Sequence, residues 1–249
     1  MSYTNEKYVR AEMLLGAEAM ERLRKSHVAV FGLGGVGSWC AEALARSGVG
    51  TLTLIDRDSF GVSNINRQLG ATTATVGEPK AEVLRRRILE IDPDTRVRAL
   101  CGHYDAEHRE AFFADYDFIV DAIDLVSCKV DLIKTAKERG IPIVSALGTG
   151  NKCDAQRLVL CDIKKTSGCP LARVVRKELR ALGIEHLDVV FSPEEPMEAE
   201  QVEAPPPGRR SVPGSLVWVP ATAGLLLCQH VVTAICKADG KGAPGVSVN

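Results

Sequence analysis

The sequence has almost no net charge and no paired cysteines. Its 31 lysine and arginine residues are balanced by 32 aspartate and glutamate residues, so the formal net charge is -1. This balance excludes attraction of the whole molecule to nucleic acid, and any polyanionic partner must meet a local basic patch. None of the eight cysteines belongs to a Cys-x-x-Cys pair, which argues against structural zinc and predicts reduced thiols in a cytosolic protein.

The sequence also lacks an export signal and a clear membrane span. Its first residues do not combine a charged stretch with an apolar one, so we expect no secretion. Only residues 215–236 approach the length of a membrane span, and Pro220, Gln229 and His230 interrupt them. Because such groups are costly in lipid, we expect a buried terminal element in a cytoplasmic protein, rather than peripheral association with a membrane.

Short β-rich runs alternate with helical patterns along the chain. The predicted strands are residues 27–32, 51–56, 96–100, 117–124, 141–147, 157–163 and 187–192. The predicted helices are residues 37–50, 80–93, 105–114, 128–140 and 171–183. This order predicts an α/β fold with a Rossmann-like, doubly wound, largely parallel sheet, helices on both faces, and a ligand at the carboxyl ends of the strands.

The length and composition predict a single domain over residues 1–249. We expect an N-terminal helical arm (1–26), a nucleotide-binding core (27–150) and a C-terminal substrate part (151–192 and 215–236) that extends the sheet. Residues 193–214 are rich in proline and acidic residues and hold few large apolar ones, which predicts a mobile loop.

A glycine pattern lies between the first predicted strand and the first predicted helix. Gly32, Gly34 and Gly37 match Gly-x-Gly-x-x-Gly, in which the glycines permit a tight turn, close approach of phosphate and packing of the helix on the strand. Asp56 closes the next strand, where a carboxylate can accept hydrogen bonds from ribose hydroxyls. The glycine pattern alone is typical of an NAD-binding site. The alternative interpretation is a tight strand-to-helix turn that binds no ligand.

The residues that follow favour ATP over a dinucleotide. The run "NINRQ" provides Asn64, Arg67 and Gln68, and Lys80 opens the next predicted helix on the same side of the sheet. Fixed cations suit a triphosphate that is attacked at its α-phosphate, and Asp124, at the end of a further strand, can hold Mg²⁺. Taken singly, these residues also fit turn positions, solvated charges or a helix cap.

At this point the sequence resembles a known superfamily. The motifs "GLGGVGSWCAEALARSGVGTLTLID", "NINRQ", "VGEPKAEV" and "VDAID" resemble the ubiquitin-activating-type adenylating enzymes, which bind MgATP and adenylate a carboxylate. The resemblance implies that ATP is bound by Gly32, Gly34, Gly35, Gly37, Asp56, Asp58, Asn64, Arg67, Gln68, Lys80 and Asp124, with Asp124 holding the metal. It also implies catalytic roles for Arg67, Lys80 and Asp124.

The resemblance assigns one further catalytic residue, Arg10. Members of the superfamily carry an arginine in an N-terminal "RYxRQ" pattern, which reaches the γ-phosphate from the partner subunit of a dimer. The matching stretch is "KYVRA", so Arg10 is the candidate and a homodimer is implied, although Lys7 and Ala11 depart from the pattern.

The C-terminal half narrows the resemblance. The stretches "DIKKTSGCPLARVVRKELR", "VVFSPEEP" and "GSLVWVPATAG" resemble the tRNA threonylcarbamoyladenosine dehydratases, which cyclise a threonylcarbamoyl group on an adenosine beside the anticodon. The resemblance to this family also leads us to expect a bound monovalent cation. The usual "DPL" is "CPL" in this chain, so Cys169 replaces an acid; a surface or packing thiol and a nucleophile are the alternatives for it.

A basic strip in the same half gives a candidate surface for tRNA. It consists of Lys164, Lys165, Arg173, Arg176, Lys177 and Arg180, opposed only by Glu178. Such a strip can follow a nucleic-acid backbone, and a solvated helix face is the alternative.

Two other functions stay open from the sequence. One is an activator of a ubiquitin-like or sulfur-carrier protein, which would make a sulfur-transfer or acceptor protein the partner; the zinc-binding members of that group carry Cys-x-x-Cys pairs that this sequence lacks. The other is an NAD-dependent oxidoreductase or a nucleotide-sensing module.

Overall fold

The protein is built around one seven-stranded sheet. The computed structural model describes residues 5–202 and 211–237. The strand order is β3-β2-β1-β4-β5-β7-β6, and β6 alone runs antiparallel to its neighbour β7. The strands are β1 (His27–Phe31), β2 (Thr51–Asp56), β3 (Arg96–Cys101), β4 (Phe118–Asp121), β5 (Ile143–Ala146), β6 (Val159–Asp162) and β7 (Asp188–Phe191). The predicted α/β fold with a largely parallel sheet is confirmed.

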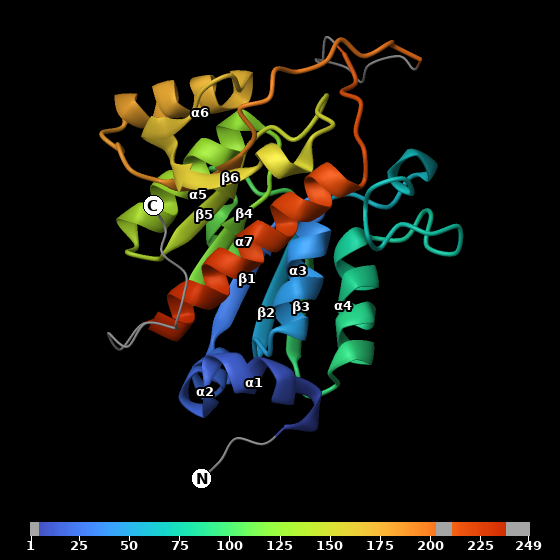
Figure 1. Cartoon of the computed structure of the whole chain (residues 1–249), viewed down its shortest axis with the longest axis vertical. Helices are drawn as coiled ribbons and strands as arrows, with labels where there is room; N and C mark the ends of the chain where they lie inside the picture. The colour runs from blue at the N-terminus through green and yellow to red at the C-terminus, as the bar shows by residue number, and fades with distance from the viewer. Residues whose placement is uncertain (1–4, 203–210, 238–249) are drawn as a thin grey trace.

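Helices cover both faces of the sheet (Figure 1). They are α1 (Val9–Leu15), α2 (Ala17–Lys25), α3 (Gly37–Arg46), α4 (Lys80–Ile91), α5 (Val126–Glu138), α6 (Pro170–Ala181) and α7 (Trp218–Lys237). Alternate residues of β1 divide the core, because Val28 and Val30 pack with α3, α4 and α7, whereas Ala29 and Phe31 pack with α5 and α6. This is the period of two that a strand imposes on its side chains.

The strand order reverses at β1, which pairs with β2 on one side and β4 on the other. In doubly wound sheets a crevice opens at this point, outside the carboxyl ends of the strands. The glycine loop follows β1 and the turn with Asp124 follows β4. The topology therefore brings two segments, more than 80 residues apart in sequence, to the same edge of the sheet.

The apolar C-terminal run forms α7, which lies across α3 (Figure 1). By length and composition α7 could cross a membrane, with a mean hydropathy of 1.6, but Val219, Leu227 and Val231 are buried in the core. A Cβ on Gly224 would lie 2.5 Å from the carbonyl oxygen of Val36, so the two helices approach closely. The predicted buried terminal element is therefore buried in part, with 44% of the apolar stretch inside the protein.

Two predicted elements are wrong in part. Residues 105–114 do not form an α-helix: Asp105 accepts the backbone N–H groups of Glu107 and His108, a local bond that competes with helix formation, and only a 3-10 turn (Arg109–Phe112) follows. The strand predicted over 117–124 ends at Asp121, whose Oδ1 accepts the N–H of Ile123 and turns the chain.

The proline-rich segment, residues 193–202 and 211–217, contains no helix or strand. It is held against the body of the protein, since the Met197 N–H donates to the Asn151 carbonyl and the Gly214 N–H donates to Asn151 Oδ1 (2.6 Å). The mobile loop expected over residues 193–214 remains a prediction. Residues 203–210 of it lie outside the described residues.

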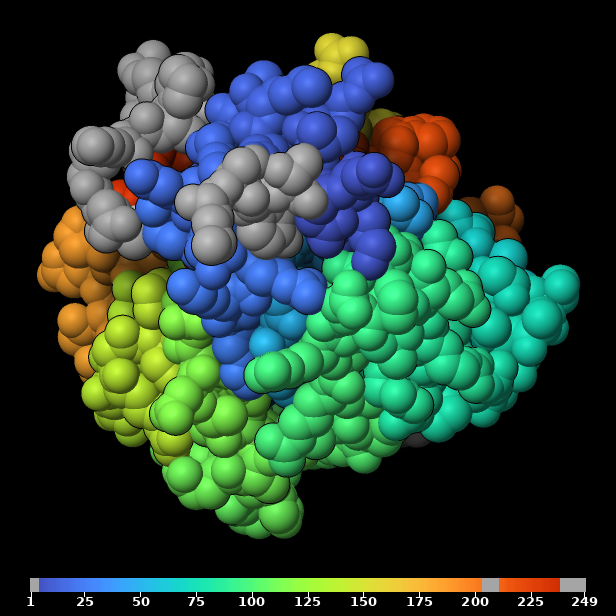
Figure 2. All heavy atoms as spheres, turned by 90° about the horizontal axis from the view of Figure 1, so that it is seen from below, coloured from blue at the N-terminus to red at the C-terminus, as the bar shows by residue number. Residues whose placement is uncertain are grey.

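The N-terminal helices lie at the amino end of the sheet, where Figure 2 shows them in dark blue. The Tyr8 hydroxyl donates to the carbonyl of Ala45 and to the fully buried carboxylate of Asp92 (2.7 Å). Burial alone would raise the pKa of Asp92, but the donors from Lys7 and Tyr8 outweigh it and hold the pKa below its usual value. These contacts fasten α1 to the ends of α3 and α4.

Candidate functional site

A cavity of about 790 Å³ opens at the carboxyl edge of the sheet, where the strand order reverses. Its size is in the range of small-molecule sites. Ten of the residues predicted to bind a nucleotide line it: Gly32, Gly34, Gly35, Asp56, Asp58, Asn64, Arg67, Gln68, Lys80 and Asp124. Gly37 lies behind the wall and Arg10 lies at the far end of the molecule.

The glycine loop follows β1 so tightly that side chains cannot be added to two of its positions. Gly32 has a φ of 87°, and a Cβ there would lie 2.6 Å from the carbonyl oxygen of Ala122. A Cβ on Gly37, the first residue of α3, would overlap the Gly32 carbonyl oxygen. A Cβ on Gly34 meets nothing nearer than Gln68 Nε2 at 3.9 Å, so this glycine faces open space.

Asp56 is fixed by two backbone donors. Its Oδ2 accepts the N–H of Leu33 (2.6 Å) and its Oδ1 accepts the N–H of Asp58 (2.8 Å). A carboxylate has about four lone-pair positions, so it can still accept hydroxyl donors from a ligand. The structure places Asp56 where the sequence predicted it and also gives it a role in holding the glycine loop.

The cationic side of the cavity comes from α4 and the loop before it. Lys80 begins α4 and is 6% exposed, with Nζ 3.4 Å from Asp58 Oδ2. The Arg67 guanidinium donates to the carbonyl of Ser63 (2.8 Å), which holds it at the rim. Fixed cations of this kind stabilise phosphate charge without reorganising.

Two amides complete this side of the cavity. Asn64 Oδ1 accepts the N–H of Gly61, so this side chain also shapes its own turn. Gln68 is 7% exposed, and its Oε1 has no hydrogen-bond partner among the described residues. Buried polar atoms are normally paired, so this oxygen is an exception within the wall of the cavity.

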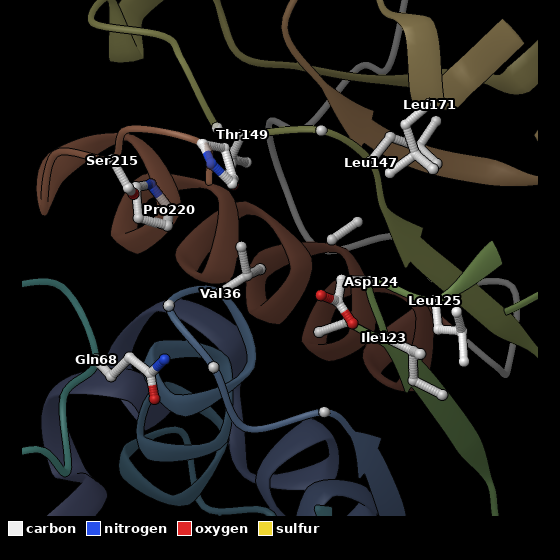
Figure 3. A pocket seen from close by; sticks show the side chains of 18 of the residues that line it. Val36, Gln68, Ile123, Asp124, Leu125, Leu147, Thr149, Leu171, Ser215 and Pro220 are labelled. Atoms are coloured by element: carbon white, nitrogen blue, oxygen red, sulfur yellow. The ribbon is translucent and has the colours of Figure 1, made fainter. Parts of the chain in front are cut away.

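Asp124 lies three residues beyond the end of β4. Figure 3 shows its carboxylate in the cavity, between the wall that carries Val36 and Gln68 and the wall that carries Leu147 and Leu171. The carboxylate is exposed, and an oxygen donor of this kind fits Mg²⁺, which takes one or two carboxylates together with phosphate oxygens.

The second wall of the cavity comes partly from the predicted C-terminal substrate part, but apart from Cys169 the sequence analysis did not single out its residues. It is formed by residues 147–152, which follow β5, by the start of α6, and by Pro196, Pro213 and Ser215 of the proline-rich segment. The run "GTGNK" after a predicted strand was the available signal, because a polar, glycine-rich stretch at a carboxyl strand end often binds a ligand.

Lys152 fastens this wall to the proline-rich segment. Its side chain is 3% exposed, and Nζ donates to the carbonyls of Ser192 (2.6 Å) and Glu194 (2.8 Å). Burial lowers the pKa of Lys152. The Glu194 carboxylate in turn accepts the N–H groups of Cys153 and Asp154, so the two segments hold each other.

Cys169 also belongs to the second wall. It is the N-terminal flanking residue of α6, is 5% exposed, and lies 3.3 Å from the position of a Cβ on Gly148. Of the interpretations of Cys169, the structure supports the packed thiol and not the surface thiol, because the side chain is buried in the cavity wall.

The members of the basic strip differ in how far they are available. Lys165, Arg173, Lys177 and Arg180 are exposed. Lys164 is paired with Glu185 (2.7 Å), and the half-buried Arg176 donates to the carbonyl (2.7 Å) and hydroxyl (2.6 Å) of Thr166. Val175 and Leu179, on the opposite face of α6, pack into the core. Arg176 therefore supports the fold through Thr166, whereas Arg173 and Lys177 point to solvent and are available to a partner.

The fold and the cavity define an α/β protein with a doubly wound sheet and one cavity at its carboxyl edge, lined by the glycine loop and by residues 147–152. The model of the ThiF family matches residues 8–246, and the chain belongs to the ThiF family. The sequence prediction of an adenylating enzyme of this superfamily is thereby confirmed.

Known members of the family resemble the chain over most of its length. It is 42% identical over 241 residues to the tRNA threonylcarbamoyladenosine dehydratase of Bacillus subtilis, covering 92% of this chain and 94% of that protein. The crystal structure of the Escherichia coli tRNA N6-threonylcarbamoyladenosine dehydratase in complex with ATP superposes with a TM-score of 0.85 at 34% identity, covering 95% and 97% of the two chains. The molybdopterin-synthase adenylyltransferase of Escherichia coli is 34% identical over 141 residues, 56% of this chain and 57% of that protein.

Two glycine variants should separate stability from binding. In Gly37→Ala the new Cβ overlaps the Gly32 carbonyl oxygen, so the free energy of unfolding should fall by about 1 to 3 kcal/mol. In Gly34→Ala the Cβ has room within the protein but lies where phosphate must approach, so ATP affinity should fall while stability is kept. Chemical denaturation and calorimetric titration with ATP measure the two effects; equal stability losses in both variants would contradict this reading.

Proposed function

We propose that this chain is an ATP-dependent tRNA threonylcarbamoyladenosine dehydratase, which forms a ring from the threonylcarbamoyl group through adenylation of the threonine carboxylate. The observation that carries the proposal is the cavity of about 790 Å³, in which the glycine loop, Lys80, Arg67 and Asp124 face one opening together with residues 147–152 and the start of α6. Similarity to the Bacillus subtilis dehydratase over 94% of that protein supports the same function.

The first wall binds ATP. Backbone N–H groups at the start of α3 meet the phosphates, and the Asp56 carboxylate accepts the ribose hydroxyls. Arg67 and Lys80 hold the β- and γ-phosphates, whose charge grows as pyrophosphate leaves. The ATP complex of the Escherichia coli relative, similar over 95% of this chain, supports this use of the cavity.

Asp124 is the residue that would hold Mg²⁺. Its exposed carboxylate in the cavity fits the metal's preference for oxygen donors. The ion supplies neutralisation of phosphate charge. The monovalent cation implied by the resemblance stays a prediction.

The substrate occupies the second wall, residues 147–152 and the start of α6. Its carboxylate oxygen attacks the α-phosphorus and pyrophosphate leaves; a nitrogen of the same threonylcarbamoyl group then attacks the acyl carbonyl, and AMP leaves with the oxygen. The nucleophile and the electrophile are tethered, so ring closure is favoured and no protein nucleophile is needed. Cys169 needs no covalent role in this scheme.

The sulfur-carrier activator is the second candidate. A single observation favours it, the 34% identity to the molybdopterin-synthase adenylyltransferase, whose match covers 56% of this chain. The dehydratase matches 92% of the chain, including the C-terminal part, so we rank it first. The NAD-dependent oxidoreductase and the nucleotide-sensing module are not retained, because the chain belongs to the ThiF family.

The remaining parts of the proposal concern assembly and location. We infer a homodimer, in which Arg10 of one subunit serves the cavity of the other, and a cytoplasmic protein, where tRNA is processed. Exposed Lys165, Arg173, Lys177 and Arg180 contact the tRNA backbone.

The function is tested with modified tRNA. Incubation with ATP, Mg²⁺ and tRNA bearing threonylcarbamoyladenosine, followed by digestion to nucleosides and mass spectrometry, should show that nucleoside lighter by one water, with AMP formed in equal amount. The variant Asp124→Asn serves as the matched negative control. Unchanged nucleoside together with adenylation of an added sulfur-carrier protein would support the second candidate instead.

Arg10 should act across the dimer. In the described chain it is exposed on α1, at the opposite end of the sheet from the cavity. Arg10→Ala should therefore reduce turnover by more than about tenfold with little change in ATP affinity. Mixed dimers of Arg10→Ala and Arg67→Ala subunits should regain part of the activity, since one of their two sites is intact. Stable mixed dimers with no regained activity would exclude the role in trans.

The exposed part of the basic strip should set the salt dependence of tRNA binding. Reversing Arg173 and Lys177 to glutamate should weaken tRNA binding and reduce the slope of log affinity against log salt by about two, because two phosphate contacts are lost. ATP binding without tRNA should not change. The control is Arg85→Glu with Arg86→Glu, an equal charge change on the solvent side of α4, where both arginines are paired with glutamates. Equal effects of the two pairs would make the strip an ordinary solvated face.

A further inference from the structure

A fully buried ion pair lies directly behind the cavity. Lys129 of α5 and Asp121 at the end of β4 both have 0% side-chain exposure, with Nζ 2.6 Å from Oδ2. Removing two charges from water is costly, and a packed apolar pair is often as stable or more so. The pair therefore calls for a reason other than stability.

The partners of the pair are all at the carboxyl ends of two strands. The hydroxyl of Ser145 in β5 donates to Asp121 Oδ2 (2.5 Å), and Lys129 Nζ also donates to the carbonyl of Ala146 (3.0 Å). Asp121 Oδ1 accepts the N–H of Ile123 (3.1 Å), which forms the turn just before Asp124. One ammonium thus links the turn after β4 to the end of β5.

This link lies where the two walls of the cavity separate. Asp121 and Ser145 are paired neighbours in the sheet. Beyond them, the chain after β4 carries Asp124, while the chain after β5 passes through Leu147 into the second wall, and Figure 3 shows these residues on separate chain segments. Lys129 therefore helps to set the distance between the Asp124 carboxylate and the second wall.

We propose that Lys129 is a positioning residue of the reaction: through Asp121 and the Ala146 carbonyl it fixes the Asp124 turn against the second wall. The inference rests on the proposed function, in which Asp124 holds Mg²⁺. Without the ammonium, the buried Asp121 carboxylate must take up a proton or admit water, and the Asp121–Ile123 bond that shapes the turn is weakened. Asp124 then loses its fixed direction.

The test compares binding of MgATP with binding of AMP, measured by calorimetric titration without tRNA. In Lys129→Met, MgATP affinity should fall by about 10- to 100-fold, the usual result of losing a group that orients a metal ligand. AMP affinity should change much less, because the glycine loop and Asp56 are untouched. ATP measured in EDTA should behave like AMP. Lys129→Arg, which keeps the positive charge, should recover part of the loss.

A matched control separates positioning from stability. Glu42 of α3 is 8% exposed and is bound by Arg46 and by Arg87 of α4, so Glu42→Gln also weakens a nearly buried ionic cluster. Glu42 does not line the cavity. Glu42→Gln should lower the melting temperature and leave the ratio of MgATP to AMP affinity as in the unmodified protein.

Several outcomes would overturn the inference. If Lys129→Met and Ser145→Ala lower the melting temperature as Glu42→Gln does but keep that affinity ratio, the cluster is only structural. If Lys129→Met does not fold, Ser145→Ala replaces it in the test, because this variant removes one hydrogen bond to Asp121 and leaves the ion pair. An unchanged ratio of MgATP to AMP affinity in Ser145→Ala would then overturn the inference. If Asp124→Asn binds MgATP as tightly as the unmodified protein does, Asp124 does not hold the metal and Lys129 cannot act through it. Failure of the tRNA assay would overturn the proposed function alone, since none of these titrations uses tRNA.

Discussion

The close contact between the glycine loop and the turn after β4 is the constraint on which the site depends. A Cβ on Gly32 would lie 2.6 Å from the Ala122 carbonyl oxygen, so backbone meets backbone between the two strands where the sheet order reverses. The contact brings the start of α3 and the Asp124 turn to one cavity. A side chain at Gly32 would force the glycine loop and the Asp124 turn apart.

The helix behind the loop is held from the other side by α7. The carbonyl of Val36 and the Cβ of Trp39 meet the space next to Gly224, which has no side chain. Because α7 is apolar and largely packed on α2 and α3, the C-terminal part of the chain supports the nucleotide loop that the N-terminal part forms. This packing joins parts of the sequence that lie far apart around one cavity.

The second wall follows a different physical logic. Apart from the start of α6, its segments have no regular secondary structure, so their polar backbone groups must be paired by side chains or by other loop backbone. Lys152 and Asn151 do this from one segment, and Glu194 does it from the other. A wall built by a few such contacts can change between relatives more easily than the glycine loop, where sterics leave no choice.

The sequence by itself determined the sheet, the glycine loop and the ATP-type residues, because periodicity, glycine spacing and polar residues at strand ends are local signals. It also carried the resemblance that the family match confirmed. It misjudged residues 105–114, where the Asp105 carboxylate captures the N–H groups a helix would need. Only the tertiary structure decided that Cys169 and Lys152 share the cavity wall, that Arg176 supports Thr166, and that Lys129 is buried against Asp121. Each of these depends on residues 8 to 42 positions apart coming together in the fold, and no local pattern encodes such a meeting.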